Sequence, residues 1–187
     1  ISWATTYHPL QQYGLTLRFV DVDLHTLNID VSQLEAALTP RTRMVVAVSI
    51  LGNPAPLDVL RAFCDAHGLY LFEDNCESLG ASLNGRPCGT FGDVNTFSTF
   101  FLTTLHDRGE VDAYIEQARR RTEIDHLARV IRNHGWTRDL PPDSPLYRRS
   151  GDDFDEAYRF IMPGYNVRPL EICGAVGVTQ LGKLDAM

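Results

Sequence analysis

The chain has 187 residues and a formal net charge of −7, and 44% of its residues are hydrophobic. These values are typical of a globular protein with its own hydrophobic core, and the negative charge argues against a general nucleic-acid-binding protein. No apolar run approaches the ~20 residues that a membrane-spanning helix needs, so a membrane protein is not expected.

The first part of the chain alternates predicted helices and strands. The run 44–50 is continuously apolar and β-branched, which is typical of a buried strand. Strand, helix and strand in succession indicate a right-handed parallel crossover. In chain order we expect a short helix at 3–13 ended by Gly14, a strand at 15–22, a helix at 33–38 capped by Asp30 or Ser32, a strand at 44–50, a helix from Pro56 to Gly68, and a strand at 69–73.

The second part is predicted to contain one more strand and two helices. Strong charge and helical composition mark the segment 111–132, whose arginines either pair with acids along the helix or form a phosphate-binding patch. Pairing on a solvated face is the favoured interpretation. The other expected elements are a Gly/Pro-rich loop at 85–92, a strand at 94–98, a loop at 141–153, and a helix at 169–184 with Ile172, Val176 and Leu181 on one face.

Two of the predicted strands end in polar residues. The apolar run at 70–72 passes directly into Glu73 and Asp74, and the run at 94–98 ends in Ser98. Parallel sheets bind ligands at the carboxyl ends of their strands, so we expect both side chains at one edge. A carboxylate beside a hydroxyl suits a cofactor with a cationic ring nitrogen and a phosphate. Position alone equally allows Asp74 to cap a helix and Ser98 to lie in a surface turn.

Four parts of the sequence together resemble a known family. They are Trp-Ala-Thr-Thr at 3–6, the motifs at 19–23 and 27–30, Glu-Asp-Asn-Cys-Glu-Ser at 73–78 with Gly-Thr-Phe-Gly-Asp at 89–93, and Pro-Gly-Tyr-Asn-Val-Arg-Pro at 163–169. In this order they resemble the DegT/StrS-type pyridoxal-phosphate-dependent sugar aminotransferases and dehydratases. The segments 74–78 and 132–138 are most similar to one branch, the GDP-4-keto-6-deoxymannose 3-dehydratases of the colitose pathway.

The resemblance implies an α/β fold. Residues 1–187 would form the central part of a three-layer, aspartate-aminotransferase-type large domain with a mostly parallel sheet. The segment 164–187 would be helical and would lead to a small C-terminal domain that lies beyond the chain. The N-terminus is not methionine, which indicates that the chain begins inside a longer protein.

The resemblance also implies a function. The cofactor would be pyridoxal 5'-phosphate or pyridoxamine 5'-phosphate, and the substrate a nucleotide-linked keto-sugar of deoxysugar and polysaccharide biosynthesis. Intact members would be homodimers.

Four cysteines without a Cys-x-x-Cys pair favour reduced cytoplasmic thiols over a disulfide framework or a metal site. The favoured activity is 3-dehydration of a 4-keto-6-deoxy sugar; the alternatives are sugar transamination and a catalytically inactive fragment or pseudoenzyme.

Individual roles follow from the same resemblance. Asp74 would pair with the pyridine nitrogen, Ser98 would contact the phosphate, and Trp3 would stack on the ring. Asn166 would reach across a dimer interface to the partner's phosphate, and Glu77 would be an acid near the cofactor. Ordinary structural roles compete with these: a core tryptophan for Trp3, a turn for Asn166, and a helix-surface acid for Glu77.

The family pattern breaks at Thr103. The family carries there a lysine that bonds covalently to the cofactor, and its 3-dehydratases carry a histidine that acts as a base. Threonine does neither near neutral pH. His106, three residues further on, is the nearest titratable substitute, and Lys183, the only lysine, lies in the last predicted helix. The segment 102–110 also lacks the family's Glu-Gly-Gly turn.

Overall fold

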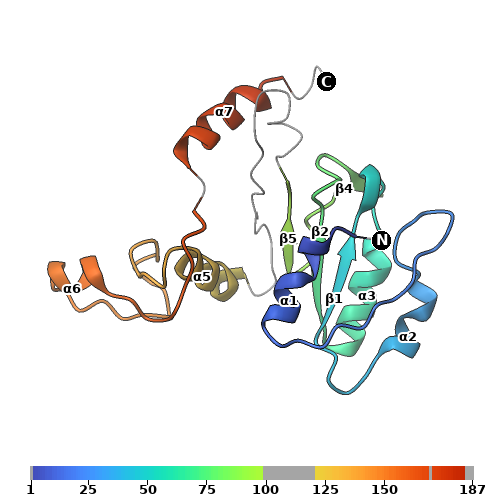
Figure 1. Cartoon of the computed structure of the whole chain (residues 1–187), viewed down its shortest axis with the longest axis horizontal. Coiled ribbons are helices and arrows are strands. Elements are labelled where there is room, and N and C mark those ends of the chain that lie inside the picture. The colour runs from blue at the N-terminus through green and yellow to red at the C-terminus, as the bar shows by residue number, and fades with distance from the viewer. Residues whose placement is uncertain (1, 99–120, 169, 184–187) are drawn as a thin grey trace. The chain divides into compact units, whose positions relative to one another are not determined.

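The computed structural model describes residues 2–98, 121–168 and 170–183. The chain divides into two compact units, Ile1–Ala118 and Arg119–Met187, each with its own helices (Figure 1). Within the described residues, no helix combines the length and the apolar composition required to cross a membrane.

A three-stranded parallel sheet forms the centre of the first unit (Figure 1). Its strands are β1 (Met44–Val48), β2 (Tyr70–Asp74) and β5 (Val94–Thr96), with β2 in the middle. Val48 pairs with Asp74, and Asp74 pairs in turn with Thr96, so the carboxyl ends of all three strands meet at one edge. The predicted α/β fold with a mostly parallel sheet is confirmed.

The helix α3 (Leu57–His67) packs against β1 and β2. Its side chains Leu57, Leu60 and Cys64 are fully buried in one cluster with Leu71 of β2. Burying each large apolar side chain stabilises the fold by about 1.5–3 kcal/mol. The helix ends at Gly68, whose left-handed φ of +65° is accessible to glycine at little cost, as the sequence predicts.

The alternation of side chains along β2 separates two environments. Successive residues of a strand point to opposite faces of the sheet. Leu71 and Glu73 therefore point to the face that α3 covers, whereas Phe72 and Asp74 point to the other face. The carboxylate at Asp74 consequently belongs to the face that is free of α3.

Short elements surround the sheet. The predicted helix at 3–13 is a 3-10 turn at Ala4–Thr6 followed by α1 (His8–Gln12), and the predicted helix at 33–38 is a 3-10 turn at Val31–Gln33 followed by α2 (Leu34–Ala37). Asp30 caps the latter by accepting a hydrogen bond from the Ser32 amide, as predicted. The strand expected at 44–50 ends two residues early, because Ile50–Gly52 turns as a 3-10 helix.

The predicted strand at 15–22 is wrong. Within it only Val22 forms a β-bridge, to Ile29, and Phe19 is largely exposed. The Asp23 side chain accepts hydrogen bonds from the His25 and Thr26 amides, so the chain turns back immediately after that pair. β-Favouring residues form a strand only where a neighbouring strand continues the ladder, and this turn ends the pairing after one step.

A small hairpin at 82–87 overlaps the loop that the sequence predicts at 85–92. Strands β3 (Ser82–Leu83) and β4 (Arg86–Pro87) are antiparallel, and they are joined by Asn84 and Gly85. Both turn residues have positive φ, +51° and +77°, which is the conformation that Asn-Gly favours in two-residue hairpins. The Asn-Gly pair was the sequence signal that the loop interpretation missed.

The second unit contains α5 (Arg121–Arg132), α6 (Asp153–Tyr158) and α7 (Glu171–Leu181). Within the described residues, α5 confirms the helix predicted at 111–132, and α7 confirms the helix predicted at 169–184. Arg129 pairs with Asp125 one turn earlier, at 2.8 Å, which supports the interpretation of intrahelical charge pairing. The short α6, capped by Asp152, was not predicted.

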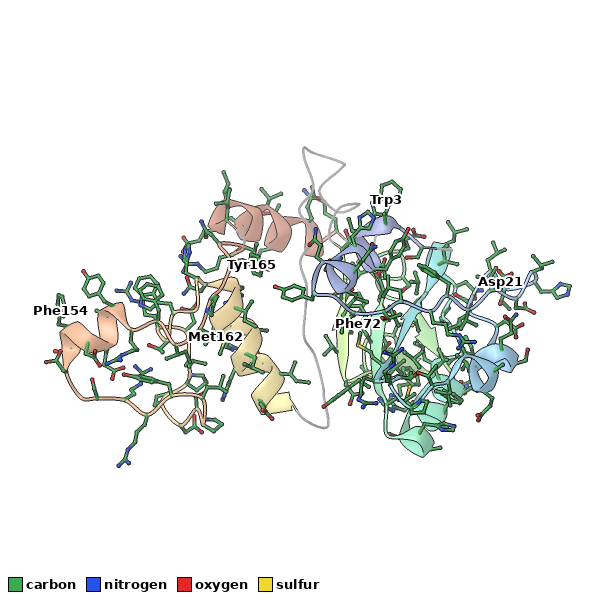
Figure 2. The ribbon with its side chains drawn as sticks, turned by 60° about the horizontal axis from the view of Figure 1, so that its bottom comes forward. Trp3, Asp21, Phe72, Phe154, Met162 and Tyr165 are labelled. Carbon is green, nitrogen blue, oxygen red and sulfur yellow. The ribbon has the colours of Figure 1, made fainter. Side chains whose placement is uncertain are left out.

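The end of α5 packs closely against the segment 160–167. The His134 amide donates to the Tyr165 carbonyl at 2.8 Å, and the Tyr165 amide donates to the Ile131 carbonyl at 2.6 Å. Figure 2 shows Met162 and Tyr165 beside this helix. Gly135 has a φ of +88°, and a Cβ built on it would overlap the carbonyl oxygen of Met162. This backbone approach requires glycine.

Candidate functional site

Asp74 lies at the carboxyl end of the central strand, and its residue is only 6% exposed. Its Oδ2 accepts a hydrogen bond from the Thr6 hydroxyl at 2.6 Å. Its Oδ1 accepts one from the Cys76 amide at 3.2 Å and a longer one from the Thr96 hydroxyl at 3.5 Å. The carboxylate is thus buried and held in one orientation from both sides.

Ser98 follows the neighbouring strand by two residues. The Asn75 amide donates to the Thr96 carbonyl at 2.9 Å, which continues the pairing of β2 with β5 past the strand ends. Ser98 is buried just beyond this pair. The structure therefore brings Asp74 and Ser98 to adjacent strand ends at one edge of the sheet, as the sequence predicts.

Glu73 has a different role from its neighbour Asp74. It is fully buried on the opposite face, where its carboxylate accepts hydrogen bonds from the Gly89 amide, at 2.7 Å, and from the Gly92 amide. A Cβ at Gly92 would lie 2.8 Å from the Leu71 carbonyl oxygen, so the turn fits closely against β2. Sequence reasoning missed this role, although two consecutive acids in a strand must face opposite sides.

Glu77 contacts the turn that follows β1. Its exposed carboxylate accepts a hydrogen bond from the Leu51 amide at 2.9 Å. Leu51 has a φ of +53°, a conformation that costs a non-glycine residue free energy. The residue lies outside any helix, so the helix-surface alternative is wrong; its position near a cofactor remains a prediction.

Trp3 precedes the 3-10 turn at Ala4–Thr6, which carries Thr6 to Asp74. The residue is 75% exposed, and Figure 2 shows it at the periphery of the first unit. This exposure contradicts the alternative that Trp3 is a core tryptophan. Trp3 lies three residues before Thr6, the hydrogen-bond donor to Asp74, and its exposed ring is available to stack on a bound cofactor ring.

The three other predicted site residues are Asn166, Thr103 and His106. Asn166 belongs to the second unit, where it is exposed and forms an antiparallel bridge with Asn133. Its role across a dimer interface remains a prediction. Thr103 and His106 lie outside the described residues.

The Cys76 thiol beside Asp74 is unsuited to nucleophilic chemistry. Burial raises its pKa to about 12, and the hydrogen bond and negative charge of Asp74 act in the same direction. The reactive form of cysteine is the thiolate, so this residue stays protonated and inert near neutral pH. In the part of the chain that the structure describes, no three His, Cys, Asp or Glu side chains form a group that could hold a metal ion.

The carboxylate of Asp74 and the hydroxyl of Ser98 at the sheet edge fit the cofactor that the resemblance implies. A buried carboxylate on one strand end can pair with a protonated pyridine nitrogen, and a hydroxyl on the next can contact a phosphate. Residues 1–187 match the model of the DegT/DnrJ/EryC1/StrS aminotransferase family. The chain belongs to this family.

Its relatives in the DegT family include enzymes of sugar metabolism. The chain is 47% identical to a GDP-4-keto-6-deoxy-D-mannose 3-dehydratase of Yersinia pseudotuberculosis, over 100% of this chain and 47% of the relative. The solved E. coli enzyme of the same name, with bound hydrated pyridoxal phosphate, matches with a TM-score of 0.86 and 44% identity, over 99% of this chain and 47% of that one. The same coverage and score hold for a mutant 3-dehydratase with bound GDP-perosamine. The chain thus spans about half the length of these relatives.

Proposed function

We propose that the chain belongs to a pyridoxal-phosphate-dependent enzyme that removes the C3 hydroxyl from a GDP-linked 4-keto-6-deoxy sugar. The observation that carries the proposal is the buried Asp74 carboxylate beside Ser98 at the edge of a parallel sheet. The 47% identity with a 3-dehydratase over the whole chain supports the choice of reaction. The bound GDP-perosamine in a related structure supports a GDP-linked sugar as the substrate class.

The described residues would divide the work of holding the cofactor. Asp74 would pair with the pyridine nitrogen, Ser98 would contact the phosphate and Trp3 would cover the ring. When bound, the cofactor supplies an electron sink that stabilises a carbanion on the substrate. The charge of Asp74 serves this by keeping a proton on the ring nitrogen.

Two other functions have specific support. A sugar aminotransferase would use the same cofactor, and GDP-perosamine synthases of this family share 30–33% identity with the chain. An inactive fragment or pseudoenzyme is supported by Thr103, which provides neither the lysine nor the histidine that the family's chemistry uses. The dehydratase is preferred as the parent activity because of the higher identity.

Replacing Asp74 tests the cofactor site. We expect Asp74→Asn to weaken the binding of pyridoxamine 5'-phosphate by roughly 10–100-fold, because a hydrogen bond to a charged group is lost. Absorbance titration of the purified chain measures the dissociation constant. Asp143→Asn, at an exposed acid of the second unit, is the matched control and should leave it unchanged. Equal affinities of Asp74→Asn and the parent, or no binding by the parent at millimolar cofactor, would contradict the assignment.

We further propose that the full enzyme is a homodimer in which Asn166 contacts the partner's cofactor phosphate. The residues around Asn166 support an interface, since Val167, Leu170 and Ile172 are all more than half exposed. Exposed apolar side chains of this kind are candidates for burial in a protein–protein contact.

Subunit complementation tests this arrangement. If each site uses Asp74 of one subunit and Asn166 of the other, mixing Asp74→Asn with Asn166→Ala subunits creates some sites that carry both native residues. We expect each mixed dimer to regain tight cofactor binding at one of its two sites, which is about one quarter of all sites when equal amounts exchange at random. Neither variant alone should show it. A monomer in sedimentation analysis, or no recovery on mixing dimers that exchange subunits, would exclude the proposal.

We place the reaction in the cytoplasm. Cys64, Cys76 and Cys88 are free thiols in the described structure, as a reducing compartment favours. Cell fractionation that recovered the protein in an extracytoplasmic fraction would refute this.

A further inference from the structure

Thr6 is hydrogen-bonded to two residues of the candidate site, Asp74 and Trp3. Its hydroxyl donates to Oδ2 of Asp74 at 2.6 Å, across 68 positions of sequence, and its own amide donates to the Trp3 carbonyl at 3.1 Å. One half-buried residue thus bonds to the buried carboxylate through its side chain and to the exposed aromatic through its backbone.

The bond to Asp74 is strong by its chemistry. A hydroxyl that donates to a carboxylate makes a charge-assisted hydrogen bond, and 2.6 Å lies in the short range typical of such bonds. It also leaves the site usable, because a carboxylate has about four acceptor positions. Thr6 therefore orients Oδ2 without excluding a ring N–H from the same carboxylate.

The short helical elements at the N-terminus have little support of their own. The 3-10 turn at Ala4–Thr6 has three residues, none buried, and its N-cap makes no side-chain hydrogen bond. Such a turn is marginal without tertiary contacts. The Thr6–Asp74 bond supplies one, and through Thr6 it links the Trp3 backbone to Asp74.

We propose that Thr6 is a positioning residue, which holds the stacking aromatic Trp3 and the ring-nitrogen partner Asp74 in one arrangement before the cofactor binds. This inference rests on the proposed cofactor site for its functional meaning. The tether itself belongs to the chain without cofactor and can be measured there.

Amide hydrogen exchange of the full chain, without cofactor, measures the tether. We expect Thr6→Val, which is nearly isosteric but lacks the hydroxyl, to speed exchange at the Thr6 and Tyr7 amides about 5–30-fold. Thr6→Ser keeps the donor and should restore slow exchange. Thr5→Val, at the exposed neighbouring threonine, is the matched control and should change neither amide. In an Asp74→Ala background, Thr6→Val should have no further effect.

Titration with pyridoxamine 5'-phosphate then measures the functional consequence. We expect Thr6→Val to weaken binding about 5–30-fold and Thr6→Ser to bind like the parent. Exchange at Leu71 in β2 reports whether the core stays intact; if Thr6→Val disturbs it, Thr6→Ala is compared with Thr6→Ser instead.

The outcomes separate this inference from the proposed function. Unchanged exchange in the donor-less variants, or the same loss in Thr6→Ser as in Thr6→Val, would overturn the tether. Altered exchange with unaltered cofactor affinity would overturn the positioning role. If the parent binds no cofactor while the exchange effects appear, the proposed function fails and the tether stands as a structural bond only.

Discussion

Gly135→Ala is expected to destabilise the second unit severely. Gly135 has a φ of +88°, which alone costs an alanine about 1 kcal/mol or more. The larger cost is steric, because the new Cβ would overlap the Met162 carbonyl oxygen and lie 2.8 Å from its carbonyl carbon. Backbone atoms cannot move aside as a side chain can. The Gly135 amide and carbonyl also bond to Val130 and Ile161, so any shift breaks hydrogen bonds on both sides.

The loss should exceed about 3 kcal/mol, which few single substitutions reach. Urea unfolding followed by tryptophan fluorescence measures it, because Trp136 stacks on Phe160 within the same unit, with ring centroids 5.5 Å apart. The emission of Trp3, in the first unit, is removed by using a Trp3→Phe background.

Two glycines of the same unit are matched controls. Gly151 has a similar φ of +79° but no atom within 4 Å of a built Cβ, so Gly151→Ala measures the conformational cost alone. Gly174 lies in α7 with open space around its Cβ, and Gly174→Ala should stabilise the helix by about 0.5–1 kcal/mol. If Gly135→Ala were no more destabilising than Gly151→Ala, the close backbone approach to Met162 would be refuted.

The sequence predicts the candidate site better than it predicts the surrounding chain. An apolar run changes to acidic residues before Asp74, and another apolar run ends at Ser98. Both changes indicate strand ends, because the strands of a parallel sheet are buried and therefore mostly apolar. Proline and glycine favour the two ends of α3 through their own backbone conformations, so the bounds of this helix can also be predicted from the sequence. Such signals depend on a few neighbouring residues.

The features that the sequence does not predict depend on distant partners. The segment 15–22 has strand-like composition, but whether it forms a strand depends on a neighbour that only the fold supplies. The bond of Thr6 to Asp74 spans 68 positions, and no local pattern marks Thr6 over its neighbour Thr5. Glu73 is similar, because its partners Gly89 and Gly92 are brought to it by the folded turn.

The chain as it stands is expected to show no measurable sugar dehydration or transamination. The family resemblance implies a histidine base or a cofactor-binding lysine at the position where this chain has Thr103. A neutral hydroxyl with a pKa far above 7 is a poor proton acceptor at that pH, and general acid–base help is worth about 10²–10⁴-fold. His106 stands three positions beyond Thr103 in the sequence, and Lys183 is the only lysine of the chain, so neither stands at the position where the family's base is expected.

The comparison should be made at full length, because the chain spans about half of its relatives. A chimaera takes its remaining length from the Yersinia pseudotuberculosis relative. In it, replacing residues 102–109 with the family-like segment Ser-His-His-Ile-Ser-Thr-Met-Glu-Gly-Gly should restore dehydration of the GDP-linked keto-sugar. The matched control is the same chimaera with the native segment, and product formation is measured by chromatography of the nucleotide sugar.

Four results would decide the role of Thr103. Turnover by the unrepaired chimaera would show that the catalytic position has been misjudged, and so would cofactor that borohydride traps covalently on it. Failure of the repaired chimaera, while it still binds pyridoxamine 5'-phosphate through Asp74, would place the defect elsewhere in the chain. Activity only after repair would mean that the Asp74–Ser98 edge retains the family's binding geometry, and that the chain's inactivity arises from the base that Thr103 cannot replace.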